Sequence, residues 1–342
     1  MKAAVVEKPG VLVVREVPDP VMGEYDALCE NLYCATCSGT DHYLIKGKFP
    51  FPIQYPGILG HEAVGRVIKA GAKVRNFLLG DRVLRTQGAL PPNSGVFLCW
   101  GGFAEYGIAR DHQAMKEDGV DQALWNGYRV NRVVPAELDS ADATMVITWR
   151  ETFSYITRMG VGYNDRVLVI GSGANGLSYV NHAANLMASK IVMVANASRL
   201  KLAEKLGAER AYDYKRKDLV ETITNDYPEG FNFIIDAIGK AGTIDDFMKL
   251  LTPDGTVGIY GIHDFYSLAM KPLCAWKTFR FYNGGYDEAE THVPIMSLVK
   301  QGRLAPRDFY DRDRIFPLEK INEAFEALER REMIKAVIKI RA

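Results

Sequence analysis

The sequence has no surplus of charge of either sign. Its 42 Lys and Arg residues balance 42 Asp and Glu residues, and neither a basic stripe nor an acidic tail stands out. Proteins that bind nucleic acid or anionic membranes usually carry such an uneven distribution of charge. We therefore expect no nucleic-acid partner and take small molecules as the expected ligands.

Long hydrophobic runs are missing as well. No stretch approaches the roughly 20 apolar residues that a membrane-spanning helix needs. The first residues, MKAAVVEKPG, do not contain the apolar core of a secretory signal peptide. We expect a cytoplasmic protein with no membrane partner.

Cysteine is scarce, with five residues in the chain. An odd number, with Cys29, Cys34 and Cys37 close together, does not suggest a disulfide framework. In a cytoplasmic chain this pattern favours a metal or reactive site. The alternative is that the thiols are small buried hydrophobic groups, and we favour that interpretation for Cys29 and Cys274.

The order of sequence patterns predicts two domains in a chain of 342 residues. Short β-type runs broken by Pro and Gly extend to about residue 145. From Arg166 apolar strands alternate with amphipathic helices, which predicts βαβ crossovers and a doubly wound parallel sheet. This alternation stops near residue 280, and one helix and a final strand end the chain. We predict an α/β protein in which residues 1–148 and 281–342 form a β-rich domain and residues 149–280 an inserted nucleotide-binding domain.

A glycine-rich turn follows the first strand of the predicted nucleotide-binding domain. The stretch VLVIGSGANG spaces Gly171, Gly173 and Gly176 as G-x-G-x-x-G, between a strand and a helix. The first glycine permits the tight turn, the second the approach of a pyrophosphate, and the third close packing of helix on strand. We predict dinucleotide binding here, with Ala174 and Asn175 taking part at the positive end of the helix.

The end of the next strand bears on the choice of dinucleotide. An acidic residue at this place would bind the adenosine ribose hydroxyls. The sequence has Ala195 and Asn196 instead, and Arg199 follows. Without a carboxylate, and with a cation nearby, a 2′-phosphate is tolerated, so we predict NADP(H) in preference to NAD(H).

A second motif covers residues 60–74, GHEAVGRVIKAGAKV, and GDRV and GGFAEY follow it. With the inserted nucleotide domain, this pattern resembles the zinc-containing alcohol dehydrogenases of the medium-chain dehydrogenase/reductase family, in the sorbitol and polyol dehydrogenase branch. The resemblance extends over nearly the whole chain. It implies a GroES-like catalytic domain, one catalytic Zn²⁺ and a Rossmann domain. Only Cys99 lies in the region where the family's structural zinc needs four cysteines, so we expect no structural zinc.

Within this motif, His61 and Glu62 are candidate metal ligands. Neutral imidazole binds zinc well, and a catalytic zinc keeps one coordination position open. Glu62 is either a direct ligand or a group that positions the ligands. The alternative for His61 is a structural histidine in a glycine-flanked turn.

The stretch CATCSGTDH at residues 34–42 resembles the family's first-ligand loop but carries an extra residue. Strict alignment of GTD puts Ser38 at the ligand position. We prefer Cys37, because zinc binds a thiolate far better than a neutral hydroxyl, with Cys34 as the fallback. By resemblance Thr40 relays the alcohol proton. His42 is a possible second relay, although the family's histidine sits where Tyr43 stands.

The family's third ligand comes from the start of the helix before the nucleotide fold, where this sequence leaves several interpretations open. The family's spacing, counted back from Gly171, places this ligand near Val146 and Ile147, whose side chains have no donor atom for a metal. Glu151, in RETFS, resembles the E-P-L-S run of the polyol branch, at the cost of a shortened helix. The alternatives are a helix-start carboxylate without a metal and a Cys–His–Glu set completed by Glu62.

These features predict a zinc-dependent dehydrogenase that transfers a hydride between a secondary alcohol and NAD(P). In the family, strand ends such as Ala237 in DAIG lie beside the nicotinamide ribose, and the habit is a homodimer or homotetramer. One rival is a zinc-free quinone or enoyl reductase of the same superfamily. Another is a non-catalytic dinucleotide-binding redox sensor.

Overall fold

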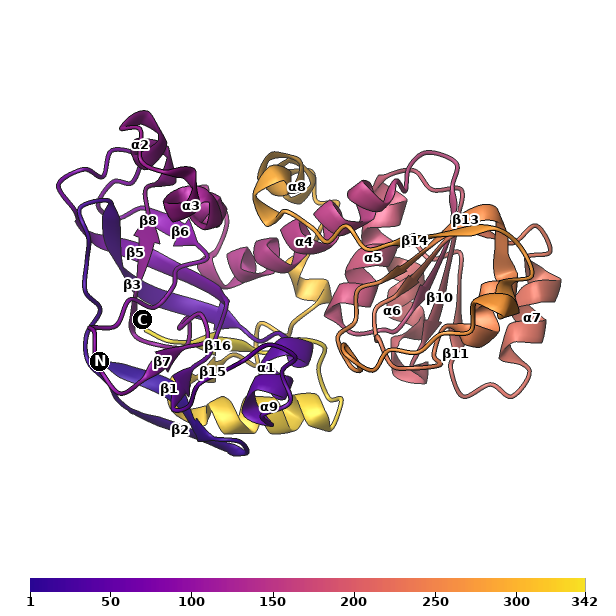
Figure 1. Cartoon of the computed structure of the whole chain (residues 1–342), viewed down its shortest axis with the longest axis horizontal. Coiled ribbons are helices and arrows are strands. Elements are labelled where there is room, and N and C mark those ends of the chain that lie inside the picture. The colour runs from indigo at the N-terminus through magenta and orange to yellow at the C-terminus, as the bar shows by residue number, and fades with distance from the viewer. Residues whose placement is uncertain (342) are drawn as a thin grey trace. The chain divides into compact units, whose positions relative to one another are not determined.

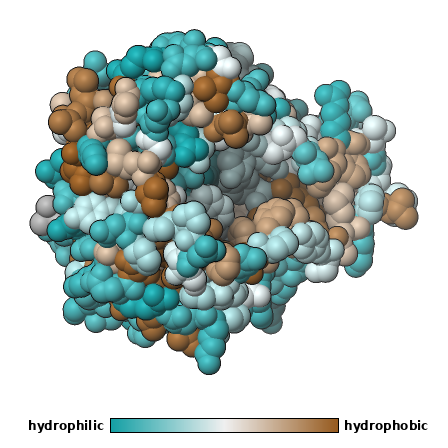
Figure 2. Space-filling view, turned by 60° about the vertical axis from the view of Figure 1, so that its left-hand side comes forward, coloured by the Kyte–Doolittle hydropathy of each residue, from teal (hydrophilic) through white to brown (hydrophobic). Residues whose placement is uncertain are grey.

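The computed structural model describes residues 1–341 and divides the chain into two compact units (Figure 1). The first comprises Met1–Ile147 and the C-terminal segment from Ala305, and the second comprises Thr148–Leu304. Within the described residues no helix has the length and apolar character needed to cross a membrane. The face seen in Figure 2 is largely hydrophilic and carries separate hydrophobic patches.

The first unit is built on two sheets. A four-stranded sheet has the order β2-β1-β4-β7, formed by Val11–Glu16, Lys2–Lys8, Gly57–Ile58 and Phe97–Leu98. A six-stranded sheet has the order β15-β16-β3-β5-β6, with β8 also paired to β3. Its strands are β15 Phe316–Pro317, β16 Val337–Lys339, β3 Asp26–Ala35, β5 Glu62–Ala70, β6 Arg82–Leu84 and β8 Tyr106–Arg110.

Short helices connect and cover these sheets. They are α1 Ser38–Ile45, α2 His112–Glu117, α3 Gln122–Trp125 and α9 Ile321–Glu329, with 3₁₀ helices at Asn126–Val130, Pro306–Asp308 and Leu318–Lys320. The C-terminal strand β16 pairs antiparallel with β3, Val337 opposite Ala35. Residues near both ends of the chain therefore share one core, which includes Val6, Leu59, Phe103 and Ile338.

The second unit contains a six-stranded, all-parallel sheet in the order β11-β10-β9-β12-β13-β14. The strands are β9 Arg166–Ile170, β10 Lys190–Ala195, β11 Arg210–Asp213, β12 Phe231–Asp236, β13 Leu251–Ile259 and β14 Phe279–Tyr282. The order reverses between β9 and β12, which is the switch point where such sheets bind ligands.

Helices flank this sheet on both sides. The helices of the second unit are α5 Ala174–Asn185, α6 Leu200–Lys205, α7 Leu219–Asp226 and α8 His292–Lys300, with 3₁₀ helices at Ala197–Arg199, Asp245–Leu250, Pro272–Ala275 and Glu288–Thr291. The long helix α4, Ser140–Met159, precedes β9. In Figure 1, α5 and α7 lie on opposite sides of the sheet, as a doubly wound fold requires.

The predicted α/β class, with a β-rich domain and a doubly wound parallel sheet, is confirmed. In the structure the second unit ends at Leu304, whereas the sequence pattern predicts its end at residue 280. Two contacts explain this difference. Strand β14 pairs with β13, and Glu288 forms a buried ion pair with Arg150 of α4. The sequence pattern does not predict α8, and it predicts a loop where the structure has α1.

Candidate active site

Strand pairing brings the predicted metal ligands together in the first unit. Ala35 at the end of β3 lies opposite Glu62 at the start of β5. Cys37 follows β3 and precedes the first turn of α1. His61 follows Gly60, which has a φ of +96° and whose added Cβ would lie 2.6 Å from the backbone nitrogen of Phe103. The motif thus needs glycine before the histidine, because the backbone there has a positive φ and leaves no room for a Cβ.

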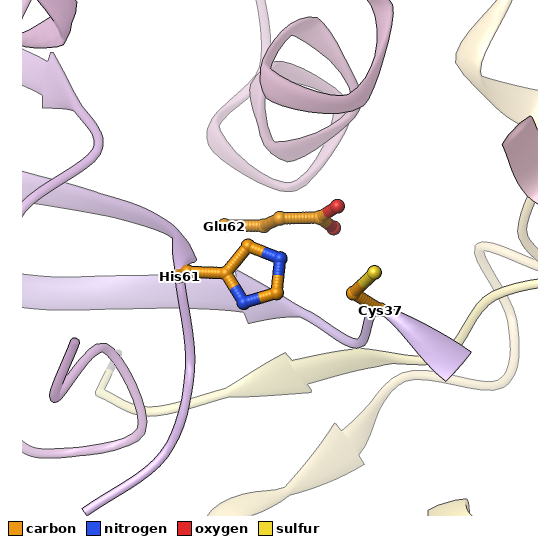
Figure 3. A group of neighbouring side chains, drawn as sticks. All are labelled: Cys37, His61 and Glu62. Atoms are coloured by element: carbon orange, nitrogen blue, oxygen red, sulfur yellow. The ribbon is translucent and has the colours of Figure 1, made fainter. Parts of the chain in front are cut away.

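The donor atoms of Cys37, His61 and Glu62 all lie within 4.8 Å of one another. His61 and Glu62 are buried and Cys37 is partly buried. In Figure 3 one ring nitrogen of His61 points toward the carboxylate of Glu62 and the sulfur of Cys37. Zinc bonds of about 2.0–2.3 Å place ligand atoms roughly 3–4 Å apart. This set of sulfur, nitrogen and oxygen donors therefore fits a zinc ion after a small contraction.

Burial sets the protonation states of two of these donors. Burial, assisted by the Glu62 carboxylate, raises the pKa of the Cys37 thiol to about 12. Burial lowers the pKa of His61 well below its usual value, so its imidazole is neutral. Neutral imidazole is the form that binds a metal, and a bound Zn²⁺ would shift the thiol toward the thiolate.

Asp41 lies in the CATCSGTDH motif, which does not reveal a role for it, and the structure places it against Cys37 and His61. Its Oδ2 accepts a hydrogen bond of 2.8 Å from the backbone nitrogen of Cys37. Its Oδ1 lies 3.8 Å from Nδ1 of His61, and neither of these two buried atoms has a hydrogen-bond partner. Burial raises the pKa of Asp41 to about 7. A carboxylate facing the outer nitrogen of a ligating histidine orients the ring.

Lys335 is a residue that sequence reasoning missed entirely. Its ammonium group donates a hydrogen bond to Oε2 of Glu62, and both side chains are buried. The two residues are 273 positions apart, so no local pattern could have linked them. Arg85 donates a hydrogen bond to the backbone oxygen of His61.

The two predicted relay residues lie in different surroundings. The hydroxyl oxygen of Thr40 is 3.5 Å from the sulfur of Cys37. Nδ1 of His42 lies 3.4 Å from Oε1 of Glu329 in α9, and the ammonium of Lys46 is 3.2 Å from the same oxygen. The structure thus brings Thr40 to the donor group and pairs His42 with the C-terminal helix.

The alternative thiol and hydroxyl are placed differently from Cys37. Cys34 belongs to the hydrophobic core and is fully buried, and Ser38 is exposed at the start of α1. Cys29 is also a core residue, and Cys274 packs against the core of the second unit.

Glu151 lies in α4, four residues after the fully buried Ile147 and therefore one helical turn further on. It is buried in the second unit. Burial raises the pKa of the Tyr179 hydroxyl there, and the Glu151 carboxylate adds to that effect. The role of Glu151 as a third ligand stays a prediction.

The glycine-rich turn has the geometry of a pyrophosphate cradle. Gly171 follows β9 with a φ of +106°, and a Cβ on Gly176 would lie 1.7 Å from the backbone oxygen of Gly171. No atom lies within 4 Å of a Cβ added to Gly173. Helix α5 begins with Ala174 and Asn175, and no side chain caps its first turn. Its backbone N–H groups therefore suit an anion.

Two further strand ends meet this turn. The backbone nitrogen of Ala237 donates to the oxygen of Ile170, and Asp236 accepts hydrogen bonds from the nitrogens of Ile238 and Gly239. After β10, the backbone nitrogen of Asn196 donates to the hydroxyl of Ser172.

The side chain of Asn196 caps the turn that follows it, accepting from Ser198. Arg199, three residues after Asn196, is partly buried, and burial lowers its pKa.

Two family models match the sequence that builds these sites. The alcohol dehydrogenase GroES-like domain matches residues 23–119, and the zinc-binding dehydrogenase model matches residues 176–279. Together they cover more than half of the chain. This chain belongs to the zinc-type alcohol dehydrogenases of the medium-chain dehydrogenase/reductase family.

Curated relatives of this family member are dehydrogenases of alcohols and polyols. D-arabinitol dehydrogenase 1 of Uromyces fabae is 22% identical over 99% of this chain and 97% of its own length. Sorbitol dehydrogenase of Gallus gallus is 26% identical over 98% and 96%. The NADP-dependent isopropanol dehydrogenase of Entamoeba histolytica is 26% identical over 94% and 91%. The dehydrogenase is thus an enzyme of the alcohol and polyol dehydrogenase type.

Solved structures agree with this dehydrogenase in fold. Alcohol dehydrogenase TADH from Thermus sp. ATN1 superposes with a TM-score of 0.82 at 23% identity, and the match covers both chains completely. A putative zinc-binding dehydrogenase from Sinorhizobium meliloti, bound to NADP, superposes with a TM-score of 0.80 at 24% identity over 99% of both chains. The GroES-like domain and the Rossmann-like sheet are therefore the fold of this chain.

Proposed function

We propose that this dehydrogenase oxidises a secondary alcohol, such as a polyol, a sugar or a related cyclic alcohol, with NADP as the preferred hydride acceptor. One catalytic Zn²⁺ would be held by Cys37, His61 and Glu62, and Glu151 is the candidate for a further ligand. The observation that carries the proposal is the convergence of three zinc-type donor atoms within 4.8 Å. The printed names of the arabinitol and sorbitol dehydrogenase relatives support a polyol.

The residues around the donor group have distinct tasks in this proposal. Zinc supplies Lewis-acid chemistry when bound, polarising an alcohol or carbonyl oxygen. Asp41 holds the Cys37 loop through its backbone nitrogen and faces the outer nitrogen of His61. Thr40 accepts the substrate's hydroxyl proton in a hydrogen bond at Oγ1 and passes it on, and His42 is the candidate for a second relay. Burial of His61 and Glu62 limits the access of water to their donor atoms.

The cofactor proposal rests on the glycine-rich turn and on the end of β10. The open space at Gly173 lets the backbone approach a pyrophosphate. No carboxylate stands at Asn196 to bind a 2′-hydroxyl or to repel a 2′-phosphate, and Arg199 supplies a cation. The NADP-dependent isopropanol dehydrogenase relative agrees with this choice.

A zinc-free reductase of the same superfamily is the second candidate. The observation in its favour is the apolar, fully buried Ile147, at a position where family members of the zinc type supply a ligand. A non-catalytic redox sensor would keep the dinucleotide site and lose turnover.

One experiment separates these possibilities. The purified protein is analysed for zinc, and a panel of secondary alcohols and sugar alcohols is assayed with NAD and with NADP. We expect close to one zinc per chain and faster turnover with NADP. Well under one zinc per chain, with reduction of a quinone or enone, would establish the zinc-free reductase. Tight dinucleotide binding without turnover would support the sensor.

We also propose that the enzyme is a homodimer or homotetramer joined through its nucleotide-binding units. Strand β14 ends the order of the sheet within the described residues. Large apolar side chains near it are exposed, namely Phe281, Leu273 and Trp276. An edge strand with such neighbours is suited to pairing with a second copy. Light scattering coupled to gel filtration measures the assembly.

A further inference from the structure

The buried pair of Lys335 and Glu62 is built by the register of the sheet in the first unit. Lys335 lies just before β16, and β16 pairs with the end of β3. Glu62 is the first residue of β5, which pairs with β3 from the other side. The two side chains are only 2% and 1% exposed. The ammonium therefore reaches Glu62 inside the protein.

This ion pair shares its carboxylate with the candidate metal group. Glu62 is one of the three residues whose donor atoms converge, yet its Oε2 already accepts a hydrogen bond from Lys335. An oxygen that accepts from an ammonium group is a poorer metal ligand. A fixed positive charge at this short range also repels a divalent cation, most strongly where water is excluded.

A catalytic zinc needs one open coordination position. If Glu62 bound the metal permanently alongside Cys37, His61 and a further protein ligand, four protein ligands would fill the tetrahedral site and leave no position for substrate. A cation that holds Glu62 partly away from the metal would keep the position accessible.

We propose that Lys335 is a positioning residue that competes with zinc for the carboxylate of Glu62 and so keeps the metal's substrate position open. The inference rests on the proposed function, because it assumes that Cys37, His61 and Glu62 face a zinc ion. It differs from a merely structural role in one respect. Substitutions of the two partners of this ion pair must change zinc affinity in opposite directions.

The test compares variants of the two partners. Glu62→Gln removes a negative donor and should weaken zinc binding about tenfold or more. Lys335→Met removes the competing cation, so it should tighten zinc binding about tenfold or more and lower kcat. Lys335→Arg keeps the charge and should stay close to wild type in both measurements.

Zinc affinity is measured by competition with a chromophoric chelator, and thermal unfolding is followed with and without Zn²⁺. Lys335→Met should lower the unfolding temperature of the metal-free protein, because the buried Glu62 carboxylate loses its ammonium partner, and it should enlarge the stabilisation by zinc. Arg150→Met is the matched control. It breaks the buried Arg150–Glu288 pair in the second unit and should lower stability without tightening zinc.

The outcomes are distinguishable. If wild type binds no zinc, the proposed metal centre fails and this inference fails with it. If wild type binds zinc but Lys335→Met weakens it or leaves it unchanged, only the role of Lys335 is refuted. If Lys335→Met does not fold, Lys335→Gln, which retains a polar partner for Glu62, takes its place under the same criteria.

Discussion

Substitution by alanine at two glycines of the cofactor loop should affect different properties, cofactor affinity at Gly173 and stability at Gly176. Gly173 has a φ of −75° and a ψ of −178°, which alanine adopts without strain, and its added methyl group meets nothing within 4 Å. The methyl group of Gly176→Ala would lie 1.7 Å from the backbone oxygen of Gly171. A real carbon cannot occupy that place, and a backbone oxygen cannot rotate away as a side chain can.

These contacts determine how much stability and cofactor affinity each variant should lose. Gly173→Ala loses part of a favourable helix start but also reduces the freedom of the unfolded chain, so stability should change by about 1 kcal/mol or less. Its methyl group enters the space where a pyrophosphate would approach, so NADP(H) affinity should fall about tenfold or more, which corresponds to about 1.4 kcal/mol. Gly176→Ala forces α5 away from β9 and should cost about 3 kcal/mol or more in unfolding free energy.

The assay pairs urea denaturation with titration of NADPH fluorescence. Gly162→Ala is the control, because it lies in the same unit and its added Cβ also meets nothing within 4 Å. It should change neither measurement. If Gly173→Ala binds NADPH like wild type, the pyrophosphate does not lie on this turn. If Gly176→Ala is as stable as wild type, the argument from the helix–strand contact is refuted.

Two further predictions concern pH and cofactor choice. Burial lowers the pKa of His182 to about 3, with Oγ1 of Thr152 2.9 Å from its Nε2. Its pKa is lower in the folded than in the unfolded protein. Its contribution to the free energy of unfolding is therefore complete above about pH 6.5, and it falls by about 1.4 kcal/mol per pH unit as the pH drops toward 3. Denaturation at several pH values should show this slope in wild type but not in His182→Gln. Asn196→Asp should lower NADP affinity about tenfold relative to NAD affinity, because its carboxylate repels a 2′-phosphate and can bind a 2′-hydroxyl, as measured by titration with both cofactors.

Each of these predictions has a clear counter-result. Equal slopes for wild type and His182→Gln would mean that His182 is not the group whose protonation opposes folding. An unchanged ratio of NADP to NAD affinity in Asn196→Asp would mean that the end of β10 does not contact the adenosine ribose.

The sequence determined the fold class and the local chemistry of this protein. Alternation of apolar strands with amphipathic helices predicts a parallel sheet wherever it occurs, because buried parallel strands and covering helices have different hydrophobic periods. Gly171, Gly173 and Gly176 are read at fixed spacing, since their roles depend on backbone freedom within one turn. Cys37, His61 and Glu62 were also found as local motifs, and the preference for Cys37 over Ser38 followed from the chemistry of zinc.

Only the tertiary structure decided what surrounds those residues. Lys335 reaches Glu62 because β16 and β5 both pair with β3, a consequence of strand register over 273 positions that no local pattern encodes. The second compact unit also extends beyond the predicted border at residue 280, since β14 and Glu288 join it through contacts with distant segments. Local sequence encodes which side chains can do the chemistry, whereas long-range pairing decides which buried charge lies beside them.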